Sequence, residues 1–416
     1  MDEVQNPYVP GAGTPPPALA GRGDLLRTVT VMLGRLQAGR FAKSLIPTGL
    51  RGVGKTVLLN RFADEAERLG FMTTTIEATE GGQLAQHLIN RLRTLLFKLD
   101  RGKQVGHAAK MAFRVLKSFT MTFGADGLKF GLDVDPEVGA ADSGDLATDM
   151  TDLFTALGEA ARENGTAILI AIDEVQYLSE TEFSALIMAV HRVSQKQLPI
   201  AVVGTGLPQI PGLAGDAKSY SERLFEFPIV GALSDADARE AIVKPARELG
   251  VEYTEAALAE MVAVTEGYPY FIQEWAYRVW NHAASSPIQV GDVTSIKGFV
   301  LQKLDESFFR VRFNRLTEQE KLYLRGMADL PLGPKKSADV AKALGRQLNS
   351  VGPLRDGLIK KGMIYSPKHG EVAFTVPLFD DFMRRAMPEY SQKGQLSGRG
   401  TPRAPKASRS TDVARS

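Results

Sequence analysis

The pattern of apolar and polar positions divides the chain into two parts. Up to about residue 232, short apolar runs alternate with helical patterns that end at glycine, which predicts an α/β domain with a parallel sheet. One run, 166–173, is apolar almost throughout, as expected of a strand that is buried on both faces. The expected strands are 44–49, 71–78, 166–173, 199–206 and 223–230.

Residues 98–145 interrupt this alternation. Apolar and polar residues alternate in 119–123, a Gly-Ala-Asp-Gly turn follows, and the alternation resumes in 128–132. A period of two on both sides of a turn predicts a β-hairpin inside an insertion. Its apolar face is too long to leave in water, so we expect it to pack on the main domain or on a partner.

The rest of the chain has a different character. From residue 233 the pattern is helical, and 311–388 shows helices followed by two short strands around a Ser-Pro-Lys-His-Gly turn. Prolines make residues 1–20 an extended arm, and the polar tail 389–416 is expected to be disordered and weakly basic.

Composition excludes several classes of site. The chain has no cysteine, which excludes disulfides, thiolate metal sites and cysteine nucleophiles. Lys and Arg number 50 against 48 Asp and Glu, so the total charge of +2 indicates no partner. No apolar run approaches the roughly 20 residues that span a bilayer, and the acidic, proline-rich start is unlike a signal peptide. We therefore expect a cytoplasmic protein.

The clearest chemical motif lies between the first expected strand and the next helix. The spacing G-x-x-x-x-G-K-T is formed by Gly49, Gly54, Lys55 and Thr56. A glycine loop lets several backbone N–H groups face one anion, and the helix adds the positive end of its dipole. Lys55 is expected to reach the β- and γ-phosphates, and the Thr56 hydroxyl to bind Mg²⁺. The residues expected to contact the nucleotide here are Gly49, Leu50, Arg51, Gly52, Val53, Gly54, Lys55, Thr56 and Val57.

A pair of acids ends the apolar run 166–173. Asp173 is placed to hold Mg²⁺ through water, and Glu174 to orient and deprotonate an attacking water. Two acids at a strand end can also be a solvated helix start. The matching phosphate loop upstream favours the catalytic interpretation.

These motifs resemble a known family. GLRGVGKT, IAIDEVQYL and VVGTG resemble the Walker A, Walker B and sensor 1 elements of AAA+ ATPases and of the related STAND ATPases. Within these groups the chain is most similar to origin-recognition-like ATPases, including Gly21-Arg22 ahead of the first helix. The resemblance covers residues 20–388. It implies ATP as the nucleotide, a P-loop core at 21–232 and a helical lid at 233–310.

The resemblance also assigns roles to single residues. Thr205 matches the sensor 1 position that reads the γ-phosphate, Arg223 matches an arginine finger supplied to a neighbouring subunit of a homo-oligomer, and Pro269 matches a lid proline near adenine. The alternatives are an ordinary threonine, a surface arginine and a plain helix start. Tyr270 and Phe271 stand where many relatives carry a sensor 2 arginine, which favours a slow switch over a motor.

The segment 311–388 resembles a winged helix-turn-helix domain. Its stretch 335–368 holds eight Lys and Arg against two Asp, which favours double-stranded DNA as a partner. The residues expected to contact DNA are Arg346, Asn349, Arg355, Lys360 and Lys368, with Arg355 on the outward face of the second helix. The alternative is a STAND-type regulator whose winged helix contacts protein. A regulator of transposition or phage defence is a third possibility, for which the sequence offers no discriminating residue.

Overall fold

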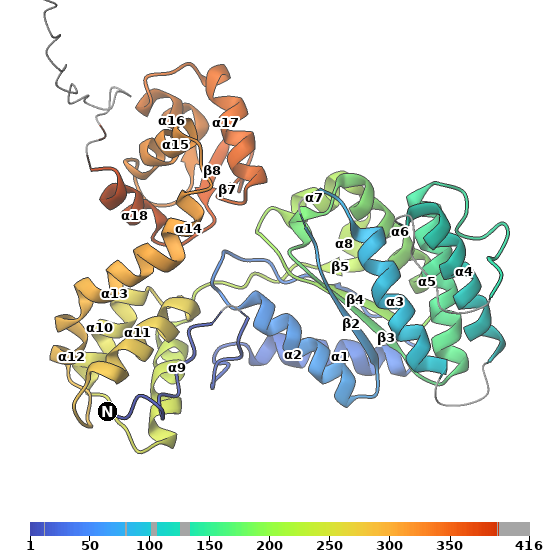
Figure 1. The fold of residues 1–416 in the computed structure, drawn as a ribbon, viewed down its shortest axis with the longest axis horizontal. Helices are drawn as coiled ribbons and strands as arrows, with labels where there is room; N and C mark the ends of the chain where they lie inside the picture. The colour runs from blue at the N-terminus through green and yellow to red at the C-terminus, as the bar shows by residue number, and fades with distance from the viewer. Residues whose placement is uncertain (12, 80, 101–105, 125–133, 389, 391–416) are drawn as a thin grey trace, which may run out of the picture.

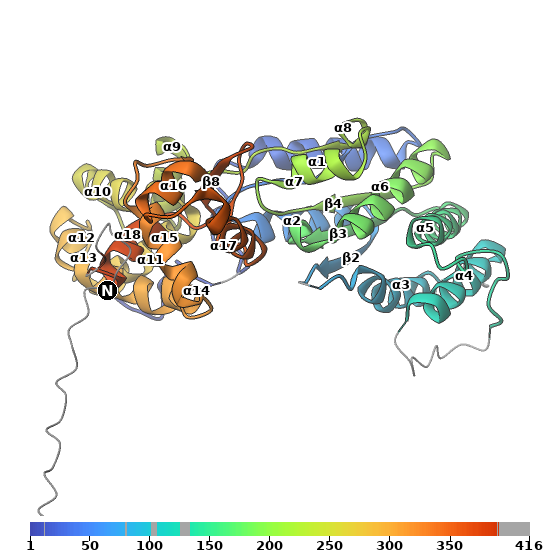
Figure 2. The ribbon, with the colours of Figure 1, turned by 90° about the horizontal axis from the view of Figure 1, so that it is seen from above.

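The structure is a computed structural model that describes residues 1–11, 13–79, 81–100, 106–124, 134–388 and 390. Figure 1 shows an α/β core on one side and two smaller helical parts on the other. We call these the core (21–232), the lid (233–310) and the C-terminal domain (311–388). The core and the two smaller parts lie side by side along the long axis (Figure 2). None of the described helices is both long and apolar enough to cross a membrane.

A parallel sheet forms the centre of the core. Its strands are β1 Ser44–Leu45, β2 Met72–Glu77, β3 Ile168–Asp173, β4 Ile200–Gly204 and β5 Phe225–Glu226. β1 pairs with β5, β2 with β3 and β3 with β4, all in parallel. A parallel bridge between Thr48 and Gly206 places β1 beside β4, so the spatial order is β5-β1-β4-β3-β2. Every residue of β3 and β4 is buried, in line with their apolar sequences.

Pro47 lies just after β1, where a proline is unexpected in a central strand. The N–H groups on either side of it, of Ile46 and Thr48, donate to the β5 side at 2.8 Å each. Because alternate N–H groups along a strand point to opposite neighbours, the missing N–H of Pro47 faces β4. There the Pro47 carbonyl accepts from Gly206 N at 3.2 Å, and the pairing with β4 begins at that carbonyl. The proline therefore removes no hydrogen bond from the sheet.

Helices cover both faces of this sheet. They are α1 Gly23–Gln37, α2 Lys55–Arg68, α3 Leu84–Asp100, α4 His107–Phe123, α5 Leu146–Glu163, the 3-10 turn η1 Val175–Tyr177, α6 Glu180–Gln195, α7 Ile210–Ala217 and α8 Ser221–Leu224. One apolar cluster packs α3 to α6 on one face, and a second packs α1 and α2 on the other.

The predicted hairpin of the insertion is wrong in its first half, and its second half, 128–132, lies outside the described residues. Residues 119–123 are the end of helix α4, not a strand. Phe119 and Phe123 lie one helical turn apart with ring centroids separated by 4.9 Å, whereas Met121 is 70% exposed. An i, i+4 apolar pair on a helix gives the same five-residue alternation as a strand. The packing of α4 between α3 and α5 favours the helix.

The lid consists of five helices, and it continues into the C-terminal domain without a break. Its helices are α9 Asp235–Glu248, α10 Glu255–Thr265, α11 Pro269–His282, α12 Val290–Ser295 and α13 Lys297–Leu304. The π-helical turn η2 Asp305–Phe309 and the short α14 Arg310–Phe313 extend α13. We call the continuous segment Lys297–Phe313 the linker helix.

The C-terminal domain contains the three helices and two strands that the sequence predicted, in the predicted order, and in addition β6 and α18, which were not predicted. They are α15 Glu318–Ala328, β6 Lys335–Lys336, α16 Ser337–Ala343, α17 Leu348–Lys360, β7 Ile364–Tyr365, β8 Glu371–Phe374 and α18 Phe379–Ala386. The strands form an antiparallel sheet of order β6-β8-β7. Of the predicted tail 389–416, only Tyr390 belongs to the described residues.

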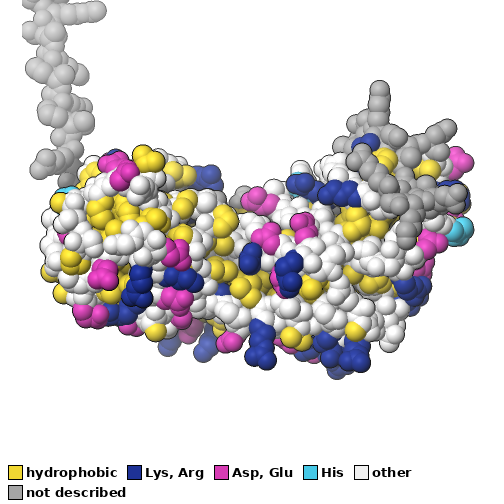
Figure 3. Space-filling view, turned by 90° about the horizontal axis from the view of Figure 1, so that it is seen from below, with side chains coloured by type: hydrophobic (Ala, Val, Ile, Leu, Met, Phe, Trp, Pro, Cys, Tyr) yellow, Lys and Arg dark blue, Asp and Glu magenta, His cyan; other side chains and the backbone are white. Residues whose placement is uncertain are grey.

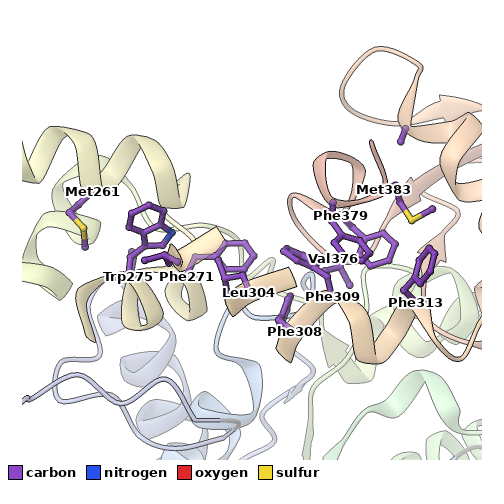
Figure 4. Packing of buried hydrophobic residues seen from close by; sticks show 14 of the residues in the cluster. Met261, Phe271, Trp275, Leu304, Phe308, Phe309, Phe313, Val376, Phe379 and Met383 are labelled. Carbon is purple, nitrogen blue, oxygen red and sulfur yellow. The ribbon is translucent and has the colours of Figure 1, made fainter. Parts of the chain in front are cut away.

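The lid and the C-terminal domain share one hydrophobic core. Figure 4 shows a row of buried side chains that runs from Trp275 of the lid, through Phe308 and Phe309 of the linker helix, to Phe379 of the C-terminal domain. Several ring pairs along this row are in contact, such as Phe309 and Phe382 at 5.2 Å. The two parts therefore have no separate cores that would let them move apart freely.

The N-terminal arm runs along the lid and then towards the core. Tyr8 is 2% exposed, and its hydroxyl donates to Ile242 O at 2.6 Å. Asp2 O accepts from the indole of Trp280 at 2.9 Å. Further on, a Cβ added to Gly13 would lie 3.4 Å from Thr56 Cγ2, so the arm passes beside the phosphate loop.

Candidate nucleotide-binding site

The phosphate loop leaves the carboxyl edge of β1 and enters α2. Gly54 precedes the first residue of α2 with φ +88°, a conformation that L side chains rarely adopt. A Cβ on Gly49 would lie 2.0 Å from Val230 O, so this position excludes any side chain. The spacing of glycines is therefore required by the path of the chain as well as by any ligand.

Lys55 is buried at the first turn of α2. Its side chain is enclosed, and Nζ donates to Leu50 O at 2.8 Å. The pKa of Lys55 is lowered to about 8, mainly by burial; Glu174 and Asp173 oppose this shift, and Arg51 contributes to it. An ammonium group that is kept from water in this way gains strongly from an anion placed beside it.

Asp173, at the end of β3, is the centre of a hydrogen-bonded group. Thr56 Oγ1 donates to Asp173 Oδ2 at 2.6 Å, and Glu174 N donates to Oδ1 at 2.9 Å. The hydroxyl of Thr205, which is fully buried at the end of β4, also donates to Oδ1. A hydroxyl and a carboxylate oxygen at this distance are the donor set with which proteins bind Mg²⁺ beside phosphates. The residues present therefore fit a Mg²⁺ ion.

Glu174 follows with φ +54°, in the left-handed region, and this turns its side chain away from the strand direction. Its Oε1 accepts from Arg51 Nη1 at 3.3 Å. Its Oε2 accepts from the amide of Gln176, whose own carbonyl oxygen accepts from Leu207 N at 3.0 Å. Both carboxylate oxygens of Glu174 are therefore engaged by side chains.

The C-terminal domain also reaches this site, through main-chain carbonyls. The Arg51 N–H donates to Thr375 O at 2.9 Å, and Arg51 Nε to Gly362 O at 3.4 Å. Arg51 Nη2 donates to the hydroxyl of Tyr177 at 3.0 Å. Sequence reasoning missed Gly362, Thr375 and Tyr177, because nothing in a motif indicates which distant carbonyl will meet the loop.

The lid approaches the same loop from another side. Pro269 is the first residue of α11, and Tyr270 N beside it donates to Gly52 O at 3.1 Å. The ring of Tyr270 stacks on Phe308 with centroids 4.5 Å apart. Arg278, two turns further along α11, is paired with Glu274 at 2.9 Å. Pro269 thus lies next to the phosphate loop, and Arg278 is held by its own helix.

Arg223 is not brought to this site. Its side chain is 83% exposed in α8, just before β5. β5 pairs in parallel with β1 from Ser44 and Phe225 onwards, so Arg223 lies at the amino edge of the sheet. The phosphate loop leaves from the opposite edge. Arg223 therefore lies away from the phosphate loop of its own chain.

The residues expected to contact DNA lie on the C-terminal domain with unequal exposure. The exposed ones are Arg346, Asn349, Lys360 and Lys368. The expectation that Arg355 points outward is wrong: its side chain is 28% exposed, pairs with Asp356 at 3.5 Å and donates to Ser366 at 3.4 Å. Of the other cations in the stretch 335–368, Lys335 is buried and Lys361 is paired with Glu320 at 2.8 Å.

Comparisons with known proteins agree with the core geometry. Residues 18–203 match the family model "AAA ATPase domain", and residues 306–383 match the model "Domain of unknown function (DUF8462)". A search of curated proteins found no match.

Solved structures are similar at low sequence identity. A Walker-type ATPase of Pyrococcus abyssi is 18% identical with a TM-score of 0.54, over 88% of this chain and 96% of that one. The Thermotoga maritima RuvB Holliday junction branch migration motor is 16% identical, with a TM-score of 0.41 over 85% and 92% of the two chains. The Aeropyrum pernix ORC1 protein, solved in complex with DNA, is 15% identical, with a TM-score of 0.42 over 89% and 94%. The family match, together with the parallel sheet and the phosphate loop, shows that this chain carries an AAA+ P-loop ATPase domain.

Proposed function

We propose that this chain is a Mg²⁺-dependent ATP hydrolase that works as a switch, with its C-terminal domain controlling the catalytic glutamate. The observation that carries the proposal is the double contact of Arg51. Its backbone and side chain bond to carbonyls of the C-terminal domain, while the same side chain holds Glu174. One residue thus connects the position of a distant domain to the acid that the chemistry needs.

The residues of the core have separate roles in this reaction. The backbone N–H groups of the phosphate loop and the Lys55 ammonium bind the phosphate tail. Thr56 and Asp173 hold Mg²⁺, which neutralises charge on the phosphate oxygens when it is bound. Thr205 fixes the Asp173 carboxylate by a hydrogen bond. Glu174 orients the attacking water and accepts its proton.

The docked C-terminal domain restrains Glu174 through its hydrogen bonds. A carboxylate accepts a proton from water only when one of its oxygens faces that water within hydrogen-bonding distance. Here Arg51 occupies Oε1, and the Gln176 amide occupies Oε2. Because two carbonyls of the C-terminal domain hold Arg51 in place, undocking of that domain would free Arg51 to release Glu174. We therefore expect the docked form to hydrolyse ATP slowly.

Gly362 provides a sharp test, because a Cβ there would lie 2.7 Å from Arg51 Nη2. Gly362→Ala should disturb docking and raise basal ATP turnover several-fold. Gly345→Ala is the matched control: Gly362 and Gly345 each follow a helix of the C-terminal domain with φ of +62° and +64°, and a Cβ on Gly345 meets no atom within 4 Å. The two variants share the backbone strain and differ in the contact. Unchanged or lower turnover in Gly362→Ala relative to Gly345→Ala would contradict the proposal.

DNA binding by the C-terminal domain is a second candidate function. It is favoured by the exposed cations Lys342, Arg346, Lys360 and Lys368, which are not needed for docking on the core. On the face shown in Figure 3, by contrast, basic and acidic side chains are interspersed. Duplex DNA bound to the exposed cations would release counterions, so its affinity should fall as salt rises. ATP turnover measured with and without duplex DNA across salt concentrations tests this function.

A further inference from the structure

Arg312, in α14 at the end of the linker helix, is a half-buried cation without a counterion. Its guanidinium carbon lies 4.2 Å from the centroid of the Phe308 ring, and Nη1 donates to the Phe308 carbonyl. Among the described residues no carboxylate forms an ion pair with it, unlike Arg385, which pairs with Asp305 at 2.6 Å. Withdrawing a charge from water without a partner is costly, which calls for an anion that the protein itself does not supply.

A short path of contacts connects Arg312 to the phosphate loop. The ring of Phe308, on which the Arg312 guanidinium lies, stacks on Tyr270 with a centroid separation of 4.5 Å. Tyr270 N in turn donates to Gly52 O of the loop at 3.1 Å. Figure 4 shows Phe308 between the lid and the C-terminal domain, at the junction that faces the core.

Electrostatic interactions place Arg312 among the groups of the site. Burial lowers the pKa of Arg312 to about 10, and Arg51 is the next largest cause, while Glu174 acts in the opposite direction. The two arginines therefore repel each other, and Glu174 attracts both of them. Glu174 is already paired with Arg51, so it cannot neutralise both.

The charges of the site are unbalanced as a result. Arg51 and Lys55 interact electrostatically with Glu174, and so does Arg312, so that the three cations outnumber Glu174 and Asp173. Asp173 is saturated by hydrogen bonds from Thr56, Thr205 and the Glu174 amide. The phosphate tail of a nucleoside triphosphate is the anion that an ATPase site receives, and ATP carries more negative charge there than ADP.

The π-helical turn explains why Arg312, and not Arg310, points towards Phe308. An α-helix advances about 100° per residue, and a π turn accommodates one additional residue, which rotates all later side chains by that amount. The turn Asp305–Phe309 lies immediately before α14. Arg310 of α14 is exposed, with its guanidinium near the Phe313 and Phe382 rings, whereas Arg312 faces Phe308.

We propose that Arg312 is a phosphate-binding residue that contacts the terminal phosphate of ATP from the linker helix. Resting on the proposed ATP switch, this names the group through which that switch distinguishes ATP from ADP. Arg278 of the neighbouring lid helix α11 is paired with Glu274, so its charge is already neutralised. Arg312 supplies its charge from the linker helix, which leads directly into the C-terminal domain.

The test compares the binding of ADP and of a non-hydrolysable ATP analogue, each with Mg²⁺, by titration calorimetry on the full chain. Arg312→Ala should weaken the affinity for the ATP analogue roughly tenfold or more and change that for ADP less than about twofold, because a charged hydrogen bond to the third phosphate is lost. Arg310→Ala, on the same helix, is the matched control and should change neither affinity. Arg312→Lys keeps the charge and should retain part of the preference if the alanine variant does not fold.

Each other outcome overturns the inference. Equal loss of both affinities in a folded Arg312→Ala protein would indicate a structural role. An unchanged preference for the ATP analogue would remove Arg312 from the site while leaving the proposed switch intact. A wild-type protein that binds neither nucleotide would overturn the proposed function itself, and with it this inference.

Discussion

The rest of the core and the C-terminal domain both contact Arg51 of the phosphate loop, but they hold it with different groups. The core contributes side chains: the carboxylate of Glu174 and the hydroxyl of Tyr177. The C-terminal domain contributes main-chain carbonyls, from Gly362 and Thr375. A side chain can take part in the reaction, whereas a contact with a main-chain carbonyl depends only on where the backbone of the C-terminal domain lies. The core side of the site therefore carries the reaction, and the C-terminal side reports whether the domain is docked.

The largest effect should come from the core side. Glu174→Gln keeps the size of the side chain and removes its ability to accept a proton, so ATP turnover should fall by roughly 10²–10⁴-fold. Nucleotide affinity should stay near that of the wild type, whereas Lys55→Ala should lose binding itself. Steady-state hydrolysis and binding titrations separate these two effects. Equal turnover in wild type and Glu174→Gln would show that Glu174 is not the general base. The contact of Arg51 with Glu174 could then not regulate hydrolysis.

A second copy of the chain could contribute Arg223 to the site, in addition to the core and the C-terminal domain. Arg223 lies at the sheet edge opposite its own phosphate loop, so it can act only on another copy. If it does, Arg223→Ala should lower turnover about 10²-fold, as removal of one transition-state donor does, without loss of ATP affinity. Arg61→Ala, an exposed arginine on α2, is the control.

Mixing of subunits makes this prediction decisive. Arg223→Ala combined with Glu174→Gln should recover part of the activity, because one mixed interface carries both intact groups. A chain that stays monomeric in saturating ATP with undiminished turnover in Arg223→Ala would show that the core and the C-terminal domain form the site alone.

The same comparison explains how much could be predicted from the sequence. The succession of strands and helices along the chain and the positions of Lys55, Asp173 and Glu174 follow from local patterns: a glycine loop between a strand and a helix, and acids at the end of a buried strand. The contact of Gly362 with Arg51 joins positions 311 residues apart. It depends on a main-chain carbonyl, a group that every residue carries, so no residue type in the sequence predicts it.

The two failures of prediction have related physical causes. The alternation at 119–123 fits a strand and an i, i+4 helix pair equally well, and only packing against α3 and α5 decides between them. The apolar residues on one face of α17 predict that Arg355 points outward, yet Ser366 of the loop between β7 and β8 lies within hydrogen-bonding distance of it. In both cases contacts with a neighbouring element, which the local pattern does not show, determined the outcome.

The third prediction concerns pH and belongs to the core side alone. Burial holds the pKa of Lys55 at about 8 in the free protein. Bound phosphates favour the ammonium form and raise this pKa, so binding takes up a proton once the free lysine is deprotonated. Affinity for ATP should thus be constant below pH 8 and fall towards tenfold per pH unit above it. Binding titrations between pH 7 and about 10 measure the midpoint.

Docking of the C-terminal domain should move that midpoint only slightly, because burial is the largest cause of the lowered pKa of Lys55, and release of Arg51 would change only a smaller electrostatic contribution. Gly362→Ala and Gly345→Ala should therefore give closely similar pH profiles. A midpoint near the ordinary lysine value in the wild type would mean that Lys55 is not buried in the free protein.

The smallest effect is expected on the outward side of the C-terminal domain, and it separates the two faces of that domain. Lys368 is exposed in the loop between β7 and β8, and a contact with phosphate would release about one counterion. Lys368→Ala should then weaken duplex binding a few-fold for all sequences and lower the salt slope by about one, while basal ATP turnover stays unchanged. Lys244→Ala on the lid is the control.

Gly362→Ala should show the reverse, with altered ATP turnover and an unchanged salt slope of duplex binding. If the wild type shows no salt-dependent duplex binding in either nucleotide state while Gly362→Ala still changes turnover, the C-terminal domain acts on the core alone, and its partner is not DNA.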